Sequence, residues 1–267
     1  MQYRELGNTG LKVSVIGFGC GWLGDASKTK QPVEIIRKSL DYGVNYFDTA
    51  HAYANSEINL GQGLGDDRKR VYISSKTGAK TKEEAWKSIH ESLERLQTDY
   101  IDNYHLYCLE DKRDIDVRLG SGGALEALIE ARDQGLIRHI GCTSHKSRQL
   151  IMALERFNFE IILIPMNVVE REPLKKLIPL CNSKRVGITI MKPVAWGALP
   201  ARLALKWLLN KPIATVVPGA TTLEQLEEDC LVGHLKDYSL TDKERKIEDE
   251  LKNKVKPESF WWHSAKQ

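Results

Sequence analysis

Residues 45–57 read NYFDTAHAYANSE, and the stretch changes character twice within thirteen positions. An apolar run at 44–47 predicts a short buried strand, and Ser56 begins a helical pattern that continues to residue 64. Between them, Asp48, His51 and Tyr53 fall within six residues. A strand that ends in an acid and leads through a polar loop into a helix is typical of an active-site corner in α/β proteins. The stretch therefore predicts a carboxylate and a phenol close to one strand end.

The same alternation of strand and helix continues on both sides of this corner. Short apolar runs predict strands at residues 15–17, 44–47, 71–74, 101–106, 137–141, 161–164, 188–191 and 214–217. Amphipathic stretches predict helices at residues 32–42, 57–64, 82–96, 123–134, 147–156, 172–183, 201–210 and 222–231. Eight strand–helix pairs favour parallel pairing and a closed (β/α)8 TIM barrel, of the α/β class, over an open sheet. We expect one domain over residues 1–267, with an N-terminal β-hairpin at 3–13 and a C-terminal helical tail from about residue 241.

Local signals mark several boundaries of these elements. Pro32 stands at a helix start, and Thr81 precedes an acidic residue by three positions, the spacing of a capping box. Gly43 and Gly135 directly follow predicted helices, as C-terminal capping glycines do. The longest predicted loop is the charged segment 109–122, which follows the fourth strand and so lies on the face where barrels carry out chemistry.

The composition restricts the possible partners. The chain is 42% apolar and 28% charged, with a formal net charge of +3, which is too small to argue for a nucleic-acid or membrane partner, and we expect neither. No apolar stretch approaches a membrane span, and the first twelve residues lack the apolar core of a signal peptide. The five cysteines are scattered, and no His-Glu-x-x-His motif occurs, so we expect a cytoplasmic location and no metal site. Nothing in the sequence indicates an oligomeric state.

Four ionisable residues fall at three neighbouring strand ends of the predicted barrel. Asp48 and Tyr53 follow the second strand, Lys76 follows the third, and His105 lies near the end of the fourth. Taken singly, each has an ordinary structural role as a helix cap, a packed ring or a core side chain. Because the carboxyl ends of barrel strands form the active site, their common location favours catalysis.

These four side chains suit acid catalysis by a phenol. A free tyrosine has a pKa of about 10, and we expect an ammonium at Lys76 to lower the pKa of Tyr53. Asp48 would hold Lys76 charged, and His105 would hydrogen-bond a carbonyl oxygen beside Tyr53. The set would protonate a carbonyl oxygen while hydride arrives at its carbon. One alternative is a barrel lyase in which Lys76 forms a Schiff base with the substrate.

A glycine-rich motif offers a second way to bind a dinucleotide. The stretch GCGWLG at residues 19–24 follows a predicted strand and matches the G-x-G-x-x-G fingerprint. The fingerprint requires a helix that opens at the glycines, whereas the next helix signal is Pro32, eight residues after Gly24. We therefore expect no Rossmann domain, and glycines that allow the backbone to approach a ligand.

Over nearly its whole length, the chain resembles the aldo-keto reductases. The similar segments are FDTAHAYANSE at 47–57, for the family's catalytic Asp and Tyr, ISSK at 73–76, for its lysine strand, and YHLY at 104–107, for its histidine strand. The resemblance implies a (β/α)8 barrel that binds a nicotinamide cofactor without a Rossmann domain. It implies a catalytic tetrad made of Asp48, Tyr53, Lys76 and His105, with Tyr53 as the proton donor.

The resemblance is weaker where the cofactor would bind. His145 replaces the Asn of the Ser-Asn pair that holds the carboxamide in the family, and Leu163 replaces a Gln. Met191 stands where an aromatic residue often stacks on the nicotinamide, and Thr221 stands at the usual basic position for the 2′-phosphate. The residues expected to bind the cofactor are Gly19, Cys20, Ser144, His145, Asn167, Lys192, Val194, Gly219, Thr221, Gln225 and Asp229. The residues expected to contact the substrate are Trp22 and His105.

The resemblance implies reduction of an aldehyde or ketone with a nicotinamide dinucleotide. Family habit favours NADP(H), whereas Asp229 disfavours a 2′-phosphate unless Lys192 compensates, so NAD(H) stays possible. The alternative from another class is a slow or non-catalytic redox-sensing subunit that binds the cofactor. Trp261 and Trp262 either cover the substrate pocket or pack on the barrel floor or a neighbouring subunit, and the packing roles are favoured.

Overall fold

Eight parallel strands form the centre of the computed structural model, which describes residues 1–260 and 262. In chain order they are β3 (Phe18–Gly19), β4 (Tyr46–Asp48), β5 (Tyr72–Thr77), β6 (Ile101–Leu106), β7 (Ile137–Thr143), β8 (Ile161–Pro165), β9 (Gly187–Met191) and β10 (Thr215–Val216). Each strand pairs with the next, and an isolated parallel bridge from Ile16 to Val216 joins the two ends of the sheet. The predicted (β/α)8 barrel is therefore confirmed.

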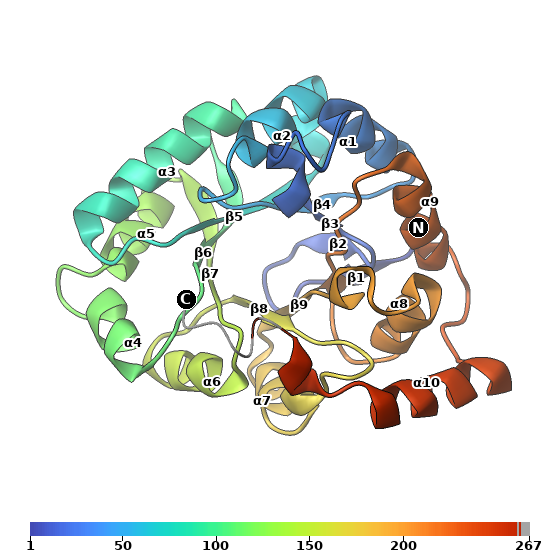
Figure 1. The fold of residues 1–267 in the computed structure, drawn as a ribbon. Helices are drawn as coiled ribbons and strands as arrows, with labels where there is room; N and C mark the ends of the chain where they lie inside the picture. The colour runs from blue at the N-terminus through green and yellow to red at the C-terminus, as the bar shows by residue number, and fades with distance from the viewer. Residues whose placement is uncertain (261, 263–267) are drawn as a thin grey trace.

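The helices surround this sheet as an outer layer (Figure 1). They are α1 (Pro32–Asp41), α2 (Ser56–Leu64), α3 (Lys82–Leu96), α4 (Lys112–Leu119), α5 (Ala124–Asp133), α6 (Ser147–Arg156), α7 (Leu177–Lys184), α8 (Ala201–Leu209), α9 (Leu223–Gly233) and α10 (Asp242–Lys254). Short 3-10 turns add η1 (Cys20–Gly24), η2 (Gly65–Arg70), η3 (Glu172–Leu174), η4 (Ala195–Gly197) and η5 (Pro257–Ser259). Among the described residues, no helix is both long enough and apolar enough to cross a membrane.

A hairpin of β1 (Tyr3–Glu5) and β2 (Lys12–Ser14) closes the amino-terminal end of the barrel, as predicted. Leu6, Leu11 and Val13 are buried there in a small apolar cluster that lies among the starts of the barrel strands. Burial of one such side chain contributes roughly 1.5–3 kcal/mol. The larger cluster fills the space between the sheet and the helices.

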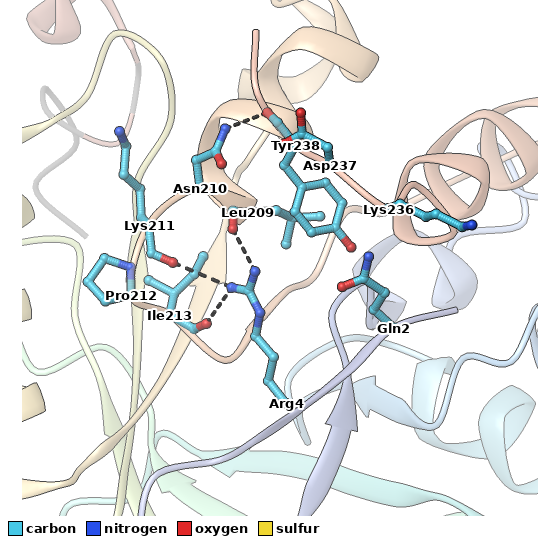
Figure 2. A pocket seen from close by; sticks show the side chains of 10 residues that line it. All are labelled: Gln2, Arg4, Leu209, Asn210, Lys211, Pro212, Ile213, Lys236, Asp237 and Tyr238. Atoms are coloured by element: carbon cyan, nitrogen blue, oxygen red, sulfur yellow. Dashed lines mark hydrogen bonds between the residues drawn. The ribbon is translucent and has the colours of Figure 1, made fainter.

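Arg4 fastens the hairpin to the same end of the barrel (Figure 2). Its guanidinium donates to the carbonyl of Leu209 at 2.6 Å, of Ile213 at 2.9 Å and of Lys211 at 3.4 Å. Leu209 is the last residue of α8, where a cation stabilises the exposed carbonyls of a helix end. The cavity of about 610 Å³ beside Arg4 therefore belongs to the structural end of the barrel, opposite the strand ends that carry the tetrad.

Three predictions about single elements are wrong. The segment 109–122 is not a loop over its whole length, because it contains α4. This helix begins after Asp111, whose carboxylate accepts the backbone N–H of Asp114. The helix predicted at 172–183 splits into η3 and α7, since Pro179 lacks an N–H and is tolerated only in a first helical turn. The first strand is not 15–17 but the two residues of β3.

Candidate active site

Three adjacent strands place the ionisable residues together at the carboxyl end of the barrel. Asp48 is the last residue of β4, Lys76 lies in β5, and His105 lies opposite Lys76 in β6. All three side chains are buried, with relative exposures of 5%, 1% and 0%. The structure thus brings together the residues that the sequence predicted at these strand ends.

Lys76 and Asp48 form the buried ion pair of this site. The Lys76 ammonium donates to Asp48 Oδ2 at 2.8 Å and to the carbonyl of Thr49. Ser74 donates to the other carboxylate oxygen of Asp48 at 3.0 Å. A buried charge is tolerated only when it is paired and hydrogen-bonded, which both partners achieve here. An ammonium held in this way has no lone pair to attack a carbonyl, so the geometry disfavours the Schiff-base alternative.

Tyr53 lies on the loop between β4 and α2, above the ion pair. The Lys76 Nζ is 5.1 Å from the centre of the Tyr53 ring, and the Tyr107 ring meets that ring edge-on at 6.1 Å. Burial raises the pKa of the Tyr53 phenol, and the negative charge of Asp48 raises it further. The expected lowering of this pKa by Lys76 is therefore wrong for this arrangement, because Asp48 already compensates the ammonium.

His105 is held by a neighbour that the sequence prediction missed. Asn103 Nδ2 lies 2.5 Å from His105 Nε2 and 3.2 Å from Ser74 Oγ, so a chain of hydrogen bonds links the imidazole to Asp48. Burial lowers the pKa of His105 well below its usual value, and the charge of Lys76 lowers it further. The ring is therefore neutral at pH 7. A Cβ atom on Gly141 would lie 2.3 Å from His105 Nδ1, so only glycine fits opposite the ring.

A second polar group lies at the ends of β7 and β9, where His145 and Lys192 were predicted to bind the cofactor. Lys192 Nζ is 2.5 Å from His145 Nε2 and 5.0 Å from the centre of the Trp262 ring. Burial lowers the pKa of Lys192 to about 8, and the charge of Glu170 opposes this shift. Trp262 Nε1 donates to Glu170 at 3.0 Å, so Trp262 packs on the face that carries Asp48 and Lys76. The favoured placement on the barrel floor is wrong for Trp262, and Trp261 lies outside the described residues.

Ser144 and Asn167 lie next to this group but bond to the protein backbone. Ser144 Oγ donates to the carbonyl of Leu109 at 2.7 Å. Asn167 Oδ1 accepts the backbone N–H groups of Val169 and Glu170 at 3.0 and 2.9 Å. Their polar atoms therefore stabilise the loops after β7 and β8.

The remaining predicted cofactor residues surround the ends of β3 and β10. Gly19 donates its N–H to Pro218, and a Cβ atom on the exposed Gly219 would lie 3.1 Å from the Gly19 carbonyl. Cys20 is buried, its thiol faces the carbonyl of Phe18, and its own carbonyl accepts a hydrogen bond from Ser56 at 2.7 Å. Val194 is half-buried just before η4.

Thr221 lies just before α9, Gln225 lies on its exposed side and Asp229 on its buried side. Gln225 Oε1 accepts hydrogen bonds from the backbone N–H and the hydroxyl of Thr221 at 2.9 and 3.1 Å. Asp229 is 6% exposed, and burial raises its pKa to about 7, with the charge of Glu228 as the smaller cause.

Trp22 pairs with Trp196, a residue that the sequence prediction missed. The two rings lie 5.3 Å apart at 73°, and they join η1 to η4. Trp22 also lies where a Cβ atom on Gly219 would approach it to 3.2 Å. Gly24, at the end of η1, packs so closely that an added Cβ atom would meet the carbonyl of Tyr53 at 2.3 Å. The glycine motif therefore lets η1 pack against the tyrosine loop.

Comparisons with known proteins agree with this arrangement. The model of the aldo/keto reductase family matches residues 15–202. The L-galactose dehydrogenase of Arabidopsis thaliana is 30% identical, over 86% of this chain and 87% of that protein. A solved aldo-keto reductase from Bacillus halodurans, in its holo form, has a TM-score of 0.82 at 27% identity, over 99% of this chain and 100% of that one. An aldo/keto reductase from Klebsiella pneumoniae in complex with NADP and acetate has a TM-score of 0.81 over 96% and 98% of the two chains, at 22% identity.

Proposed function

The chain belongs to the aldo/keto reductase family, and we propose that it reduces an aldehyde or ketone to an alcohol with a nicotinamide dinucleotide. The observation that carries this proposal is the buried Lys76–Asp48 ion pair beneath the Tyr53 ring. A compensated ammonium near a partly buried phenol is suited to carbonyl reduction, because charge develops on an oxygen next to it.

In this reaction, the bound dinucleotide supplies the hydride that the carbonyl carbon receives. Tyr53 gives its proton to the carbonyl oxygen, which completes the alcohol and leaves a phenolate. The raised pKa of Tyr53 keeps the phenol protonated before reaction, so that it can act as the proton donor. Asn103 fixes the neutral His105 ring opposite Lys76 on the neighbouring strand.

We propose NADP(H) as the cofactor, since a relative of the same fold is known in complex with NADP. The glycines Gly19 and Gly219 let the ends of β3 and β10 approach each other more closely than a Cβ atom would allow. The N-terminal N–H groups of α9 suit a phosphate. His145 and Lys192 would stand in for the amide side chains that the family uses at the carboxamide.

Two titrations and one assay test the proposal. Fluorescence titration with NADPH and with NADH gives the two dissociation constants, and steady-state turnover of an aldehyde panel with the preferred cofactor tests the reaction. Tyr53→Phe is the matched inactive control, because it removes the phenol hydroxyl and keeps the ring. Tight binding of NADPH without turnover of any aldehyde would favour the redox-sensing subunit instead.

We also propose a cytoplasmic location. Cys20, Cys142, Cys181 and Cys230 all carry thiols rather than disulfides, and burial raises the pKa of each of them. Buried thiols of this kind fit a reducing compartment.

A further inference from the structure

The loop that carries Tyr53 is fastened on its outer side by a histidine that the tetrad does not use. His51 lies two residues before Tyr53, and its Nε2 is 2.6 Å from Glu91 Oε2 on α3. Both side chains are partly buried, with exposures of 25% and 35%. The bond from His51 is the largest cause of the lowered pKa of Glu91, so the carboxylate is ionised at neutral pH.

The backbone of His51 is held as well as its side chain. Its N–H donates to the carbonyl of Lys76 at 3.1 Å, and its carbonyl accepts from Arg95 Nη1 at 3.2 Å. One residue therefore ties the loop to β5 on the barrel side and to α3 on the outer side.

The acidic and basic groups behind His51 form a continuous network. Arg95 lies 3.6 Å from Glu91 and 3.7 Å from Glu57. Glu57 is 1% exposed and accepts a hydrogen bond at 2.6 Å from Ser75, the residue before Lys76. Lys87 lies 3.9 Å from Glu91 at the exposed edge of the network. Within this network, each buried charge lies close to an opposite charge. His51 is the residue through which the network contacts the loop that carries Tyr53.

We propose that His51, held by Glu91, is a positioning residue that keeps the Tyr53 phenol over Lys76. The inference rests on the proposed function for its effect on turnover. His51 acts through the loop. A misplacement of about 1 Å at a reacting group can cost on the order of a hundredfold in rate, so a loosened loop lowers turnover. Binding of the dinucleotide is unaffected, because its predicted sites lie at β3, β7, β9 and β10.

Amide hydrogen exchange in the full chain, without any cofactor, tests whether the contact between His51 and Glu91 holds the loop that carries Tyr53. We expect a peptide covering residues 49–56 to exchange about tenfold faster in His51→Ala than in the unmodified protein. His51→Gln should restore slow exchange, since its amide can donate to Glu91. His90→Ala is the matched control, because His90 is the exposed neighbour of Glu91 and stacks on Trp86. Unchanged exchange in His51→Ala would overturn the proposal, whether or not the protein reduces aldehydes.

Steady-state kinetics with NADPH and an aldehyde from the panel test the consequence. We expect His51→Ala to lower kcat about tenfold, with the NADPH Kd and the aldehyde KM within twofold of the unmodified protein, and His51→Gln to recover most of the loss. A normal kcat in His51→Ala, or an equal loss in His90→Ala, would contradict the positioning role. An unmodified protein that turns over no aldehyde would refute the proposed function. The exchange result would still decide whether His51 holds the loop that carries Tyr53.

Discussion

Lys76 is a fully buried ammonium, and its surroundings explain why it is stable there. Asp48 pairs with it at 2.8 Å, and the Thr49 carbonyl accepts a second hydrogen bond. Removal of one partner of such a pair typically costs about 3–5 kcal/mol, because the other charge is left uncompensated. The same pair that compensates these charges lies next to the Tyr53 ring, the proposed proton donor.

Tyr53→Phe tests the proton donor directly. The substitution keeps the ring that packs against Tyr107 and removes only the hydroxyl. We expect kcat to fall by about a hundredfold or more, the scale of general acid catalysis, with the NADPH Kd nearly unchanged. The measurement is turnover of the preferred aldehyde at saturating NADPH. Near-normal turnover in this variant would exclude Tyr53 from the mechanism.

Asp229 gives a pH dependence of stability with a definite sign. Its pKa is about 7 in the folded protein and about 4 in an unfolded chain, so between these values the folded state holds a proton that the unfolded state has lost. The free energy of unfolding therefore falls as pH rises from about 4 to about 7 on account of this group. Asp229→Asn removes the free-energy cost of ionising this buried carboxyl group. We therefore expect the Tm of the variant to exceed that of the unmodified protein at pH 8 but not at pH 4.

The matched control for this prediction is Asp66→Asn, because Asp66 is exposed on η2. Thermal unfolding of the three proteins at both pH values isolates the effect of burial. An increase in Tm for Asp229→Asn that is equal at pH 4 and pH 8 would show that ionisation of the carboxyl group does not destabilise the protein.

At the scale of single elements, Thr81 shows how a short sequence pattern determines a helix start. Its hydroxyl accepts the N–H of Glu84 at 3.3 Å, and the Glu84 carboxylate accepts the N–H of Thr81 at 3.3 Å. We expect Thr81→Ala to lower the free energy of unfolding by about 1 kcal/mol, and Thr81→Ser to lower it by much less. Urea unfolding with an unchanged m-value is the measurement. An equal loss in both variants would mean that the hydroxyl is not what stabilises α3.

The elements that sequence reasoning missed lack such clear signals. The start of α4 depends on Asp111, yet an aspartate in a charged segment is equally typical of a turn. The shift from residues 15–17 to β3 has a tertiary cause, because the partners of Phe18 and Gly19 are Phe47 and Asp48 in the next strand. A strand of two residues has too few positions for its register to be read from alternation alone.

At the scale of the whole molecule, the strand order predicted the barrel and the location of Asp48, Lys76 and His105 on three adjacent strands. The parts that it did not predict depend on contacts across the barrel. Asn103 shares the inward face of β6 with His105, a relation that period-two spacing indicates, but its bond to Ser74 requires the register of β5 and β6. The return of Trp262 to Glu170 joins residues 92 positions apart, and no local pattern indicates it.

The choice between the two dinucleotides is also a property of the whole molecule, since it depends on which cations reach the start of α9. The segment from Gly219 to Asp229 contains no Lys or Arg, and the Thr221 hydroxyl donates its hydrogen bond to Gln225. We therefore expect NADPH to be preferred over NADH by less than about a hundredfold, or roughly 2.7 kcal/mol. Thr221→Arg adds a guanidinium beside the N-terminal N–H groups of α9, and we expect it to shift the preference further towards NADPH, with Thr221→Gln as the uncharged control. Dissociation constants for both cofactors decide the question. A thousandfold preference for NADPH in the unmodified protein would show that basic residues from other elements reach the 2′-phosphate, because α9 itself supplies none near its start.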